Sequence, residues 1–290
     1  TAPGIRPADQ VLMITLKSPQ EIQRLQESAD LVSEVQNRMH AIAEPGLPTL
    51  ELDRLAESLI RGYGAEPVFK GYRGFPYTVC VSINEQVVHG FPSSRVLREG
   101  DVLSLDVGVR YQGYVGDCAR TIPIGEVSPE AGLLIRRAYL ALQEACRAVQ
   151  AGKRLGDVCH TVETIAHHYG YGVVRDFVGH GVGREMHEDP QVPNYGIPGT
   201  GPRLKHGLVI CIEPMFNLGT HEVEVLSDRW TVVTKDRRLS VHVEDMVALL
   251  PEGPKVLTSA GGVQLPGPEE IEEVTRMLAQ AQPKVRLRRS

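Results

Sequence analysis

The feature that most constrains the fold of this chain is an internal repeat. In the first half, Ser18-Pro19-Gln20-Glu21 has the pattern of a capping box with proline at the first helical position. Apolar residues at helical spacing follow it until Gly46. In the second half, Ser128-Pro129 opens a comparable helix that ends at Gly152, 106 positions after Gly46. The repeat therefore begins with one long helix in each half.

A shorter helix follows each long one at the same offset. The first is expected from about Thr49 to Gly64, and the second from about Asp157 to Gly170. Their inward positions match in pairs: Leu52 with Val158, Ala56 with Val162, and Leu59 with Ile165. Chance supplies one such match easily, but not all of them together. The sequence therefore predicts a duplicated helix–helix–strand unit.

Strands follow each predicted helix pair. Residues 77–89 indicate a hairpin that turns at Asn84-Glu85, and residues 101–124 indicate another that turns near Gly113. In the second half we expect strands at residues 173–178, 208–216, 230–234 and 240–249. The predicted fold class is α/β (α+β), in which the two halves join their strands into one curved antiparallel sheet with the helices outside.

Composition excludes several classes of protein. The net charge of −5 and the pI of about 6.1 give no overall basic field for nucleic acid or anionic lipid. The longest apolar runs, such as residues 208–212, are far below the ~18 residues that a membrane span requires. Five cysteines without a Cys-x-x-Cys pair argue against a disulfide framework and against a thiolate zinc site. We therefore expect a cytoplasmic protein.

Acidic residues inside apolar strands are the main chemical signal. Asp106 and Asp117 lie in the two strands of the second predicted hairpin, which could place both carboxylates on one sheet face. Glu213 and Glu244 also lie in strands that otherwise read as buried. On residues alone, two solvated surface aspartates or a structural ion pair remain alternatives for any one of these positions. Burying several carboxylates is costly unless a positive partner is shared, and lysine and arginine are scarce in these strands.

A histidine between glycines adds to this set. In Gly179-His180-Gly181-Val182-Gly183 the glycines allow close backbone approach, which suits a ligand site. A phosphate-binding loop is the weaker alternative, because no lysine or Ser/Thr follows as a P-loop requires. Four carboxylates and one imidazole in such strands favour a bound metal.

The motifs together resemble the type I methionine aminopeptidases of metallopeptidase family M24. The resemblance covers roughly residues 18–258 and rests on the residues around the five positions above, on residues 79–85, and on Val88-His89-Gly90. It implies the pita-bread fold, with two halves related by a pseudo-twofold axis, which the internal repeat supports independently.

The resemblance also implies roles for individual residues. Two divalent metal ions, Mn, Fe or Co, would be held by five ligands: Asp106, Asp117, His180, Glu213 and Glu244. Two metal ions ~3.5–4 Å apart can activate water and polarise a carbonyl group. Glu213 would also carry the proton of the attacking water, His187 would donate to the carbonyl oxygen, and His89 would contact the scissile amide.

A pocket for the methionine side chain is implied as well. Its expected substrate-binding residues are Tyr72, Phe75, Cys80, His89, Met186, His187 and Trp230. The apolar ones would otherwise be assigned to the core. The sequence departs from the family pattern at four positions, which bear on pocket shape and on the surroundings of the ligands: Met186, Phe75, His242 and Asp245.

We expect three segments. Residues 1–17 would be an N-terminal lead-in, residues 18–258 the metallopeptidase domain, and residues 259–290 a C-terminal tail with an apolar stripe at Ile271, Val274, Met277 and Leu278. The basic end, residues 284–289, suggests a weak ribosome contact, but we favour a solvated, mobile terminus. The expected partners are the N-termini of peptides and nascent proteins, without a membrane, and the chain is expected to be a monomer.

Two other functions remain as alternatives. A proline peptidase shares this fold and metal set but normally carries a large N-terminal domain, and only 17 residues precede the first helix here. The fold also serves as a metal-free binding module, in which ligands are lost, whereas all five are present in this chain. The ~26 residues between His187 and Glu213 leave no room for the helical insertion of type II enzymes.

Overall fold

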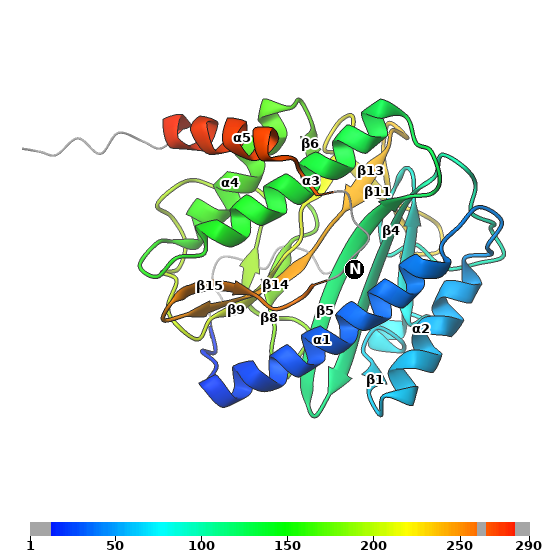
Figure 1. Ribbon diagram of the computed structural model, residues 1–290, viewed down its shortest axis with the longest axis horizontal. Coiled ribbons are helices and arrows are strands. Elements are labelled where there is room, and N and C mark those ends of the chain that lie inside the picture. The colour runs from blue at the N-terminus through cyan, green and yellow to red at the C-terminus, as the bar shows by residue number, and fades with distance from the viewer. Residues whose placement is uncertain (1–12, 260–264, 282–290) are drawn as a thin grey trace, which may run out of the picture.

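Helices enclose a layer of β-strands in this structure, which is a computed structural model that describes residues 13–259 and 265–281 (Figure 1). The helices are α1 (Pro19–Ile42), α2 (Leu50–Gly62), α3 (Pro129–Ala148), α4 (Leu155–His168) and α5 (Pro268–Ala281), with a 3₁₀ turn η1 (Tyr72–Gly74). The strands of the first half are β1 (Glu66–Pro67), β2 (Val79–Ile83), β3 (Gln86–Val88), β4 (Val102–Tyr111) and β5 (Tyr114–Pro123). The strands of the second half are β6 (Gly172–Val173), β7 (Gly179–Gly181), β8 (Glu188–Val192), β9 (Val209–Ile212), β10 (Met215–Asn217), β11 (Val223–Val225), β12 (Val232–Thr234), β13 (Ser240–His242), β14 (Asp245–Leu250) and β15 (Gly253–Val256).

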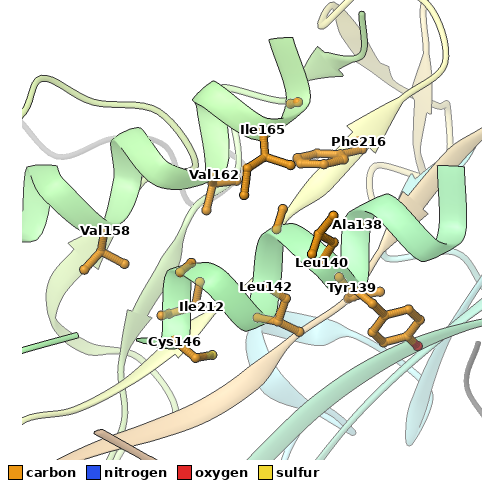
Figure 2. Packing of buried hydrophobic residues seen from close by; sticks show 14 of the residues in the cluster. Ala138, Tyr139, Leu140, Leu142, Cys146, Val158, Val162, Ile165, Ile212 and Phe216 are labelled. Carbon is orange, nitrogen blue, oxygen red and sulfur yellow. The ribbon is translucent and has the colours of Figure 1, made fainter. Parts of the chain in front are cut away.

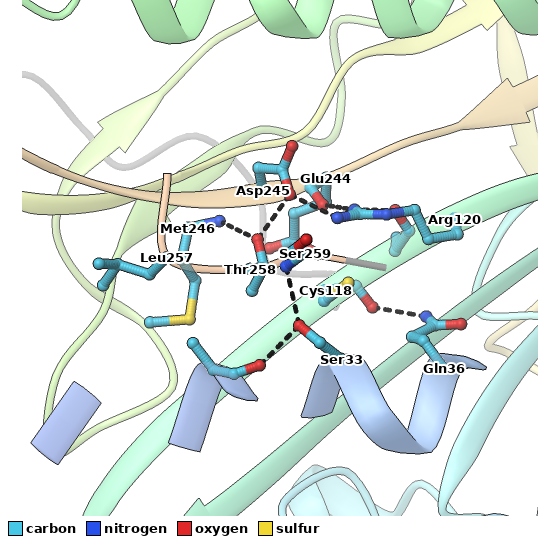
Figure 3. Close-up of polar contacts among 12 residues, drawn as sticks. Ser33, Gln36, Cys118, Arg120, Glu244, Asp245, Met246, Leu257, Thr258 and Ser259 are labelled. Carbon is cyan, nitrogen blue, oxygen red and sulfur yellow. Dashed lines mark hydrogen bonds and ion pairs between the residues drawn. The ribbon is translucent and has the colours of Figure 1, made fainter. Parts of the chain in front are cut away.

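The long helix α1 begins at the predicted capping box. The Ser18 hydroxyl accepts a hydrogen bond from the Glu21 amide, and the Glu21 carboxylate accepts one from the Ser18 amide. Farther along α1, the buried Gln36 amide donates to the carbonyl oxygens of Leu105 at 2.8 Å and Cys118 at 2.9 Å. These two bonds fasten α1 across the β4–β5 hairpin, and Figure 3 shows the one to Cys118.

The predicted repeat is present in the backbone of both halves. Gly46 and Gly152 end the regions of α1 and α3 with φ of +101° and +85°. Gly64 and Gly170 follow α2 and α4 with φ of +71° and +78°. All four lie in the left-handed region that favours glycine. The chain therefore makes the same turn at matched positions of the two halves.

The two halves build separate apolar cores under their helices. The second-half core contains the matched positions Val158, Val162 and Ile165, which are at most 1% exposed. Figure 2 shows these side chains of α4 and those of α3 meeting Ile212 and Phe216 from the sheet. The first-half core contains Leu52 and Ala56 of α2. The helices therefore cover the outside of the strands, as the repeat predicted.

Most strands pair antiparallel. β4 pairs with β1, β2 and β5 in the first half, and a five-stranded sheet in the second half has the order β15-β14-β9-β7-β8. Two three-stranded sheets have the orders β13-β10-β6 and β11-β12-β3. An isolated bridge between Ala119 in β5 and Glu244, just before β14, links the sheets of the two halves. The sequence predicted the β4–β5 hairpin, and it is confirmed.

The hairpin predicted at residues 77–89 was wrong in its pairing. The turn at Asn84-Glu85 forms, but β3 pairs with β12 from the second half, whereas β2 pairs with β4. The longer β4 offers β2 a five-residue register from Val79↔Val107 to Ile83↔Leu103. Tertiary partners have replaced the local ladder, although the Val81 amide still donates to Gly90 O at 2.8 Å, so this turn joins two different sheets.

Both ends of the described chain contact the body of the molecule. Lys17 is buried, its backbone amide donates to Gly207 O at 2.7 Å, and its ammonium pairs with Glu188 at 2.5 Å. At the other end, α5 buries Val274 completely, with Ile271, Met277 and Leu278 packed against the second-half core. The expectation of a solvated tail was therefore wrong for α5, because its apolar stripe is used for packing. The basic end, residues 284–289, lies outside the described residues.

Among the described helices, none is both long enough and apolar enough to cross a membrane.

Candidate active site

The β4–β5 hairpin places two of the predicted ligands on one face. Asp106 lies opposite Ala119, and Gly108 lies opposite Asp117, so the register puts both aspartates on the same side of the ladder. The bridge from Ala119 to Glu244 adds the carboxylate of Glu244 beside them. The expectation that both aspartates share a sheet face is confirmed, and β-sheet register is its cause.

The other two predicted ligands come from the second half. The His180 Nε2 atom lies 3.8 Å from Asp117 Oδ2 and 3.8 Å from Glu213 Oε1. Gly179 and Gly181 allow β7 to fit there, because a Cβ at either position would lie 2.2–2.3 Å from a backbone oxygen of a neighbouring strand. The close approach that the glycines predicted is therefore present, and the structure brings all five predicted ligands to one place.

These acids are buried without enough partners in the protein. One oxygen each of Asp106, Asp117 and Glu244 is buried and accepts no hydrogen bond from a described residue. Burial raises the pKa of Asp106 to about 7 and that of Glu213 to about 8. Burial and the neighbouring carboxylates raise the pKa of Asp117 and Glu244 well above the usual range. A divalent cation would satisfy these oxygens, so the residues present fit the metal centre that the sequence predicts.

The imidazoles at the site are neutral at physiological pH. Burial lowers the pKa of His180 to about 4 and that of His89 to about 4. For His187, burial, with nearby His180 and Arg73, lowers the pKa to about 3. A neutral imidazole has a free lone pair for a metal ion or an N–H to donate, so these side chains are in the state that both predicted roles require.

A cavity of about 250 Å³ opens above the carboxylates. Asp106, His180 and Glu213 line it, together with His89 and His187. The His187 ring lies 4.4 Å from the His180 ring between centroids. Its Nδ1 atom is 3.0 Å from the Tyr72 hydroxyl, which can donate to it. The three residues predicted to be catalytic, His89, His187 and Glu213, therefore face a common space.

The apolar residues of the predicted substrate pocket gather beside this cavity. Phe75, Cys80 and Met186 are buried in one hydrophobic cluster, and Tyr72 and Trp230 pack against it. The Phe75 and Trp230 rings meet edge to face with centroids 5.1 Å apart. Cys80 lies directly opposite Asp106 in the β2–β4 ladder, so the apolar cluster touches the carboxylates.

Two departures from the family pattern have partners in the structure. His242 Nε2 lies 3.4 Å from Glu213 Oε2, which places this imidazole beside a predicted ligand. Asp245 pairs with the buried Arg120 at 2.5 Å. Both departures from the family pattern, His242 and Asp245, therefore lie next to the predicted metal-binding carboxylates or their neighbours.

Several residues at the site were missed in the sequence. Cys211 lies two positions before Glu213, and its sulfur lies within 4.8 Å of a ligand atom of Asp117, His180 and Glu244. The alternation of side chains along β9 was the signal that could have found it. Arg73, between Gly71 and Gly74, and Phe177 also line the cavity. These two residues reach the cavity only because segments far apart in the sequence pack together. No local sequence pattern predicts such packing.

Comparison with known proteins agrees with this geometry. The chain is 50% identical over 247 residues to the methionine aminopeptidase of Clostridium acetobutylicum, which covers 85% of this chain and 99% of that protein. It is 43% identical over 246 residues to methionine aminopeptidase 1 of Bacillus subtilis, with coverage of 85% and 99%.

Solved structures give the same result for the fold. A methionine aminopeptidase crystal structure from Thermotoga maritima superposes with a TM-score of 0.84 at 40% identity, over 85% of this chain and all of that chain. A prolidase from Pyrococcus furiosus superposes with a TM-score of 0.67 at 26% identity, over 85% of this chain and 66% of that chain. The predicted pita-bread fold is thereby confirmed. Residues 23–250 match the profile of metallopeptidase family M24, so with these relatives the chain belongs to that family.

Proposed function

We propose that this protein removes the N-terminal methionine from peptides and nascent proteins whose second residue is small, as a type I methionine aminopeptidase. The observation that carries the proposal is the group of buried carboxylates with unsatisfied oxygens around His180, at the base of a cavity beside an apolar cluster. The relatives that match this chain over 99% of their length are methionine aminopeptidases.

The proposed cofactor is a pair of divalent ions, Mn, Fe or Co. Asp106, Asp117, His180, Glu213 and Glu244 would hold it, because mixed carboxylate and imidazole ligands suit these metals. When bound, such a pair polarises the scissile carbonyl and lowers the pKa of water, so that attack is feasible at neutral pH. The membership in a metallopeptidase family and the buried cluster both support metal use.

The chain's own side chains would position and protonate the substrate. Glu213, as a carboxylate in the metal-loaded site, would take a proton from the attacking water and pass it to the leaving amine. A Tyr72 hydroxyl that donates to His187 Nδ1 leaves the proton on Nε2, so neutral His187 would donate to the carbonyl oxygen. His89 would contact the scissile amide.

The apolar cluster would select the methionine side chain. Phe75, Cys80, Met186 and Trp230 offer aromatic and sulfur-containing surfaces, which suit an unbranched thioether. The cavity of about 250 Å³ is small, and this supports a small second residue in the substrate.

Proline-peptide cleavage is the alternative within the same family. The prolidase structures superpose with TM-scores of 0.67–0.70 and 24–27% identity, whereas the methionine aminopeptidase structures reach 0.84 and up to 40%. The better agreement over the whole catalytic region favours methionine as the substrate.

We place this activity in the cytoplasm, because its proposed substrates are newly made chains. We also propose that the protein acts as a monomer. The weak ribosome contact proposed for residues 284–289 would bring the enzyme to these chains.

A peptide panel tests the proposed function. The chelated protein is assayed with Mn, Fe and Co in turn on Met-Ala, Met-Lys, Ala-Ala and Xaa-Pro peptides of equal length. We expect fast release of methionine from Met-Ala and little cleavage of Met-Lys. Preferred cleavage of Xaa-Pro peptides with methionine retained would support the prolidase alternative instead.

A further inference from the structure

A buried arginine lies behind the metal ligands, on the other face of the β5 strand. Arg120 follows Asp117 by three residues, so its side chain points away from the carboxylates. Only 4% of this side chain is exposed, and Arg120 itself takes no part in the proposed catalytic steps. A charge buried this deeply is costly unless all of its donors are used, so its contacts require an explanation.

The guanidinium group of Arg120 binds three acceptors in both halves of the molecule (Figure 3). Nη1 donates to Ala119 O at 2.9 Å and to Glu244 O in a short hydrogen bond. Nη2 pairs with Asp245 Oδ1 at 2.5 Å. One side chain of the first half is thus bonded to two consecutive residues of the second half.

Asp245 is itself held in place by the chain that follows β15. The Thr258 hydroxyl donates to Asp245 Oδ1 at 2.5 Å and accepts from the Met246 amide at 3.1 Å. Arg120, Asp245 and Thr258 therefore form a continuous polar network, which we call the clasp.

The clasp lies at the junction of the two halves, where backbone pairing is sparse and side chains supply the other bonds: the Thr121 hydroxyl donates to His242 O at 2.7 Å and accepts from the His242 amide at 3.1 Å. Between β5 and the segment before β14, the described backbone pairing is the isolated bridge at Ala119 and Glu244, in which the Glu244 amide donates to Ala119 O at 2.9 Å. A single bridge fixes neither the angle nor the spacing of two strands as firmly as a ladder of several pairs does. Asp117 and Glu244 come from opposite sides of this junction.

We propose that the Arg120–Asp245 clasp is a positioning device that sets the spacing of Asp117 and Glu244, and thereby the affinity of the site for its metal ions. Arginine suits this task because its planar fork can reach two carbonyl oxygens and a carboxylate at once, which a lysine ammonium cannot do with the same rigidity. The inference rests on the metal centre of the proposed function.

Metal affinity is the property to measure. Full-length protein is stripped with chelator, and Mn²⁺ binding is followed by titration calorimetry, with stoichiometry checked by elemental analysis. For Arg120→Met we expect Mn²⁺ affinity to fall about 10–100-fold, the usual cost of losing a group that orients metal ligands. Arg120→Lys should give an intermediate loss, because one contact can be kept. Wild-type protein that binds no Mn²⁺ would contradict the metal centre itself, not the clasp alone.

A second variant separates positioning from stability. In Arg120→Met/Asp245→Leu no buried charge is left unpaired, so the melting temperature should return toward that of the wild type. The contact to Glu244 O stays absent, and the Mn²⁺ affinity should stay low. Ile165→Ala in α4 is the matched control, because α4 packs on α3, α5 and β6, and the variant should lower stability through a core cavity away from the junction and leave Mn²⁺ affinity unchanged.

The outcomes decide the proposal. Mn²⁺ affinity within twofold of the wild type in Arg120→Met, or recovered in the double variant together with stability, would overturn it. If Arg120→Met does not fold, the double variant carries the same test. If that also fails, Arg120→Lys with wild-type affinity would be the contradicting result.

Discussion

The floor and the rim of the catalytic cavity are built in different ways. The floor consists of the five predicted ligands, which lie in or next to paired strands: Asp106, Asp117, His180, Glu213 and Glu244. The rim consists of Tyr72, Arg73, His89 and His187, which lie in the 3₁₀ turn η1 and in irregular segments outside the strands. Arg73 and His89 have φ of 50° and 59°, a conformation that side chains seldom adopt. The floor is positioned by strand register and the rim by local backbone conformation, so changes in the two regions should have different consequences.

Removal of metal should have the largest effect, because it acts on the whole floor. We expect chelation to abolish peptide cleavage, and Mn, Fe or Co to restore it, since buried oxygens of Asp106, Asp117 and Glu244 have no hydrogen-bond partner among the described residues. The measurement is the initial rate on a Met-Ala peptide before and after chelation. Undiminished activity in a preparation shown by elemental analysis to be metal-free would contradict the assignment of the floor.

A matched histidine pair tests the boundary between floor and rim. His180→Ala should lower both metal content and rate, because its imidazole lies 3.8 Å from Asp117 and Glu213. His187→Ala should keep its metal and lose roughly 10²–10³ in kcat, the usual cost of one lost donor to a developing oxyanion. Elemental analysis and kcat are measured on both variants. Equal metal loss in the two would place His187 in the floor.

We expect the titration of the acids in the floor to control how the stability of the metal-free protein depends on pH. Burial raises the pKa of Asp106 to about 7 and of Glu213 to about 8, above their values in the unfolded chain. The metal-free folded state therefore binds more protons than the unfolded state, and its stability should fall as pH rises through 7 and 8. The buried rim histidines, whose pKa is lowered, affect stability only below about pH 6.5.

The expected loss between pH 7 and pH 9 is about 2 kcal/mol in the free energy of unfolding. Urea unfolding of chelated protein at both pH values measures it. Glu213→Gln removes one of the titrating floor acids and should make the dependence on pH less steep. A stability that rises with pH over this interval would show that these acids are not protonated in the metal-free protein.

A change outside both regions should alter stability and leave catalysis intact. Val274 of α5 is fully buried against the second-half core, away from the cavity lining. Val274→Ala should lower the free energy of unfolding by about 1–2 kcal/mol through lost burial. Truncation after Gly261 should cost more stability. Unchanged kcat/KM and metal content are expected in both, and a several-fold loss of kcat/KM would mean that the tail influences the cavity.

The smallest effect is expected at the outer rim. Arg73 lines the cavity, and its guanidinium lies 5.3 Å from the centre of the Tyr72 ring. Arg73→Gln should reduce kcat/KM for Met-Ala-Asp peptides about two- to fivefold relative to Met-Ala-Asn peptides, because exposed charge pairs contribute little. High salt should remove the difference. Arg38→Gln, on the exposed side of α1, is the control. The same peptide ratio in wild type and Arg73→Gln would exclude this contact.

Much of the scaffold could be predicted from the sequence, because its signals are local. The capping box at Ser18 and the glycines at 46, 64, 152 and 170 act within a few residues of themselves, so their pattern survives any tertiary context. The Gly113 turn and the alternation along the two strands likewise predicted that Asp106 and Asp117 share a face. The fold and the convergence of the five floor residues followed from these patterns and from the family resemblance.

Tertiary structure alone decided which distant segments meet. β3 pairs with β12 and not with β2, Arg120 reaches Asp245, Cys211 joins the floor, and α5 docks on the second-half core. In each case the partners are separated by many residues, and several partners would satisfy the same local pattern equally well. The choice among them depends on packing and on the burial of polar groups over the whole molecule. For this chain, periodicity and caps determined the elements, and only the folded arrangement determined the surroundings of the carboxylates.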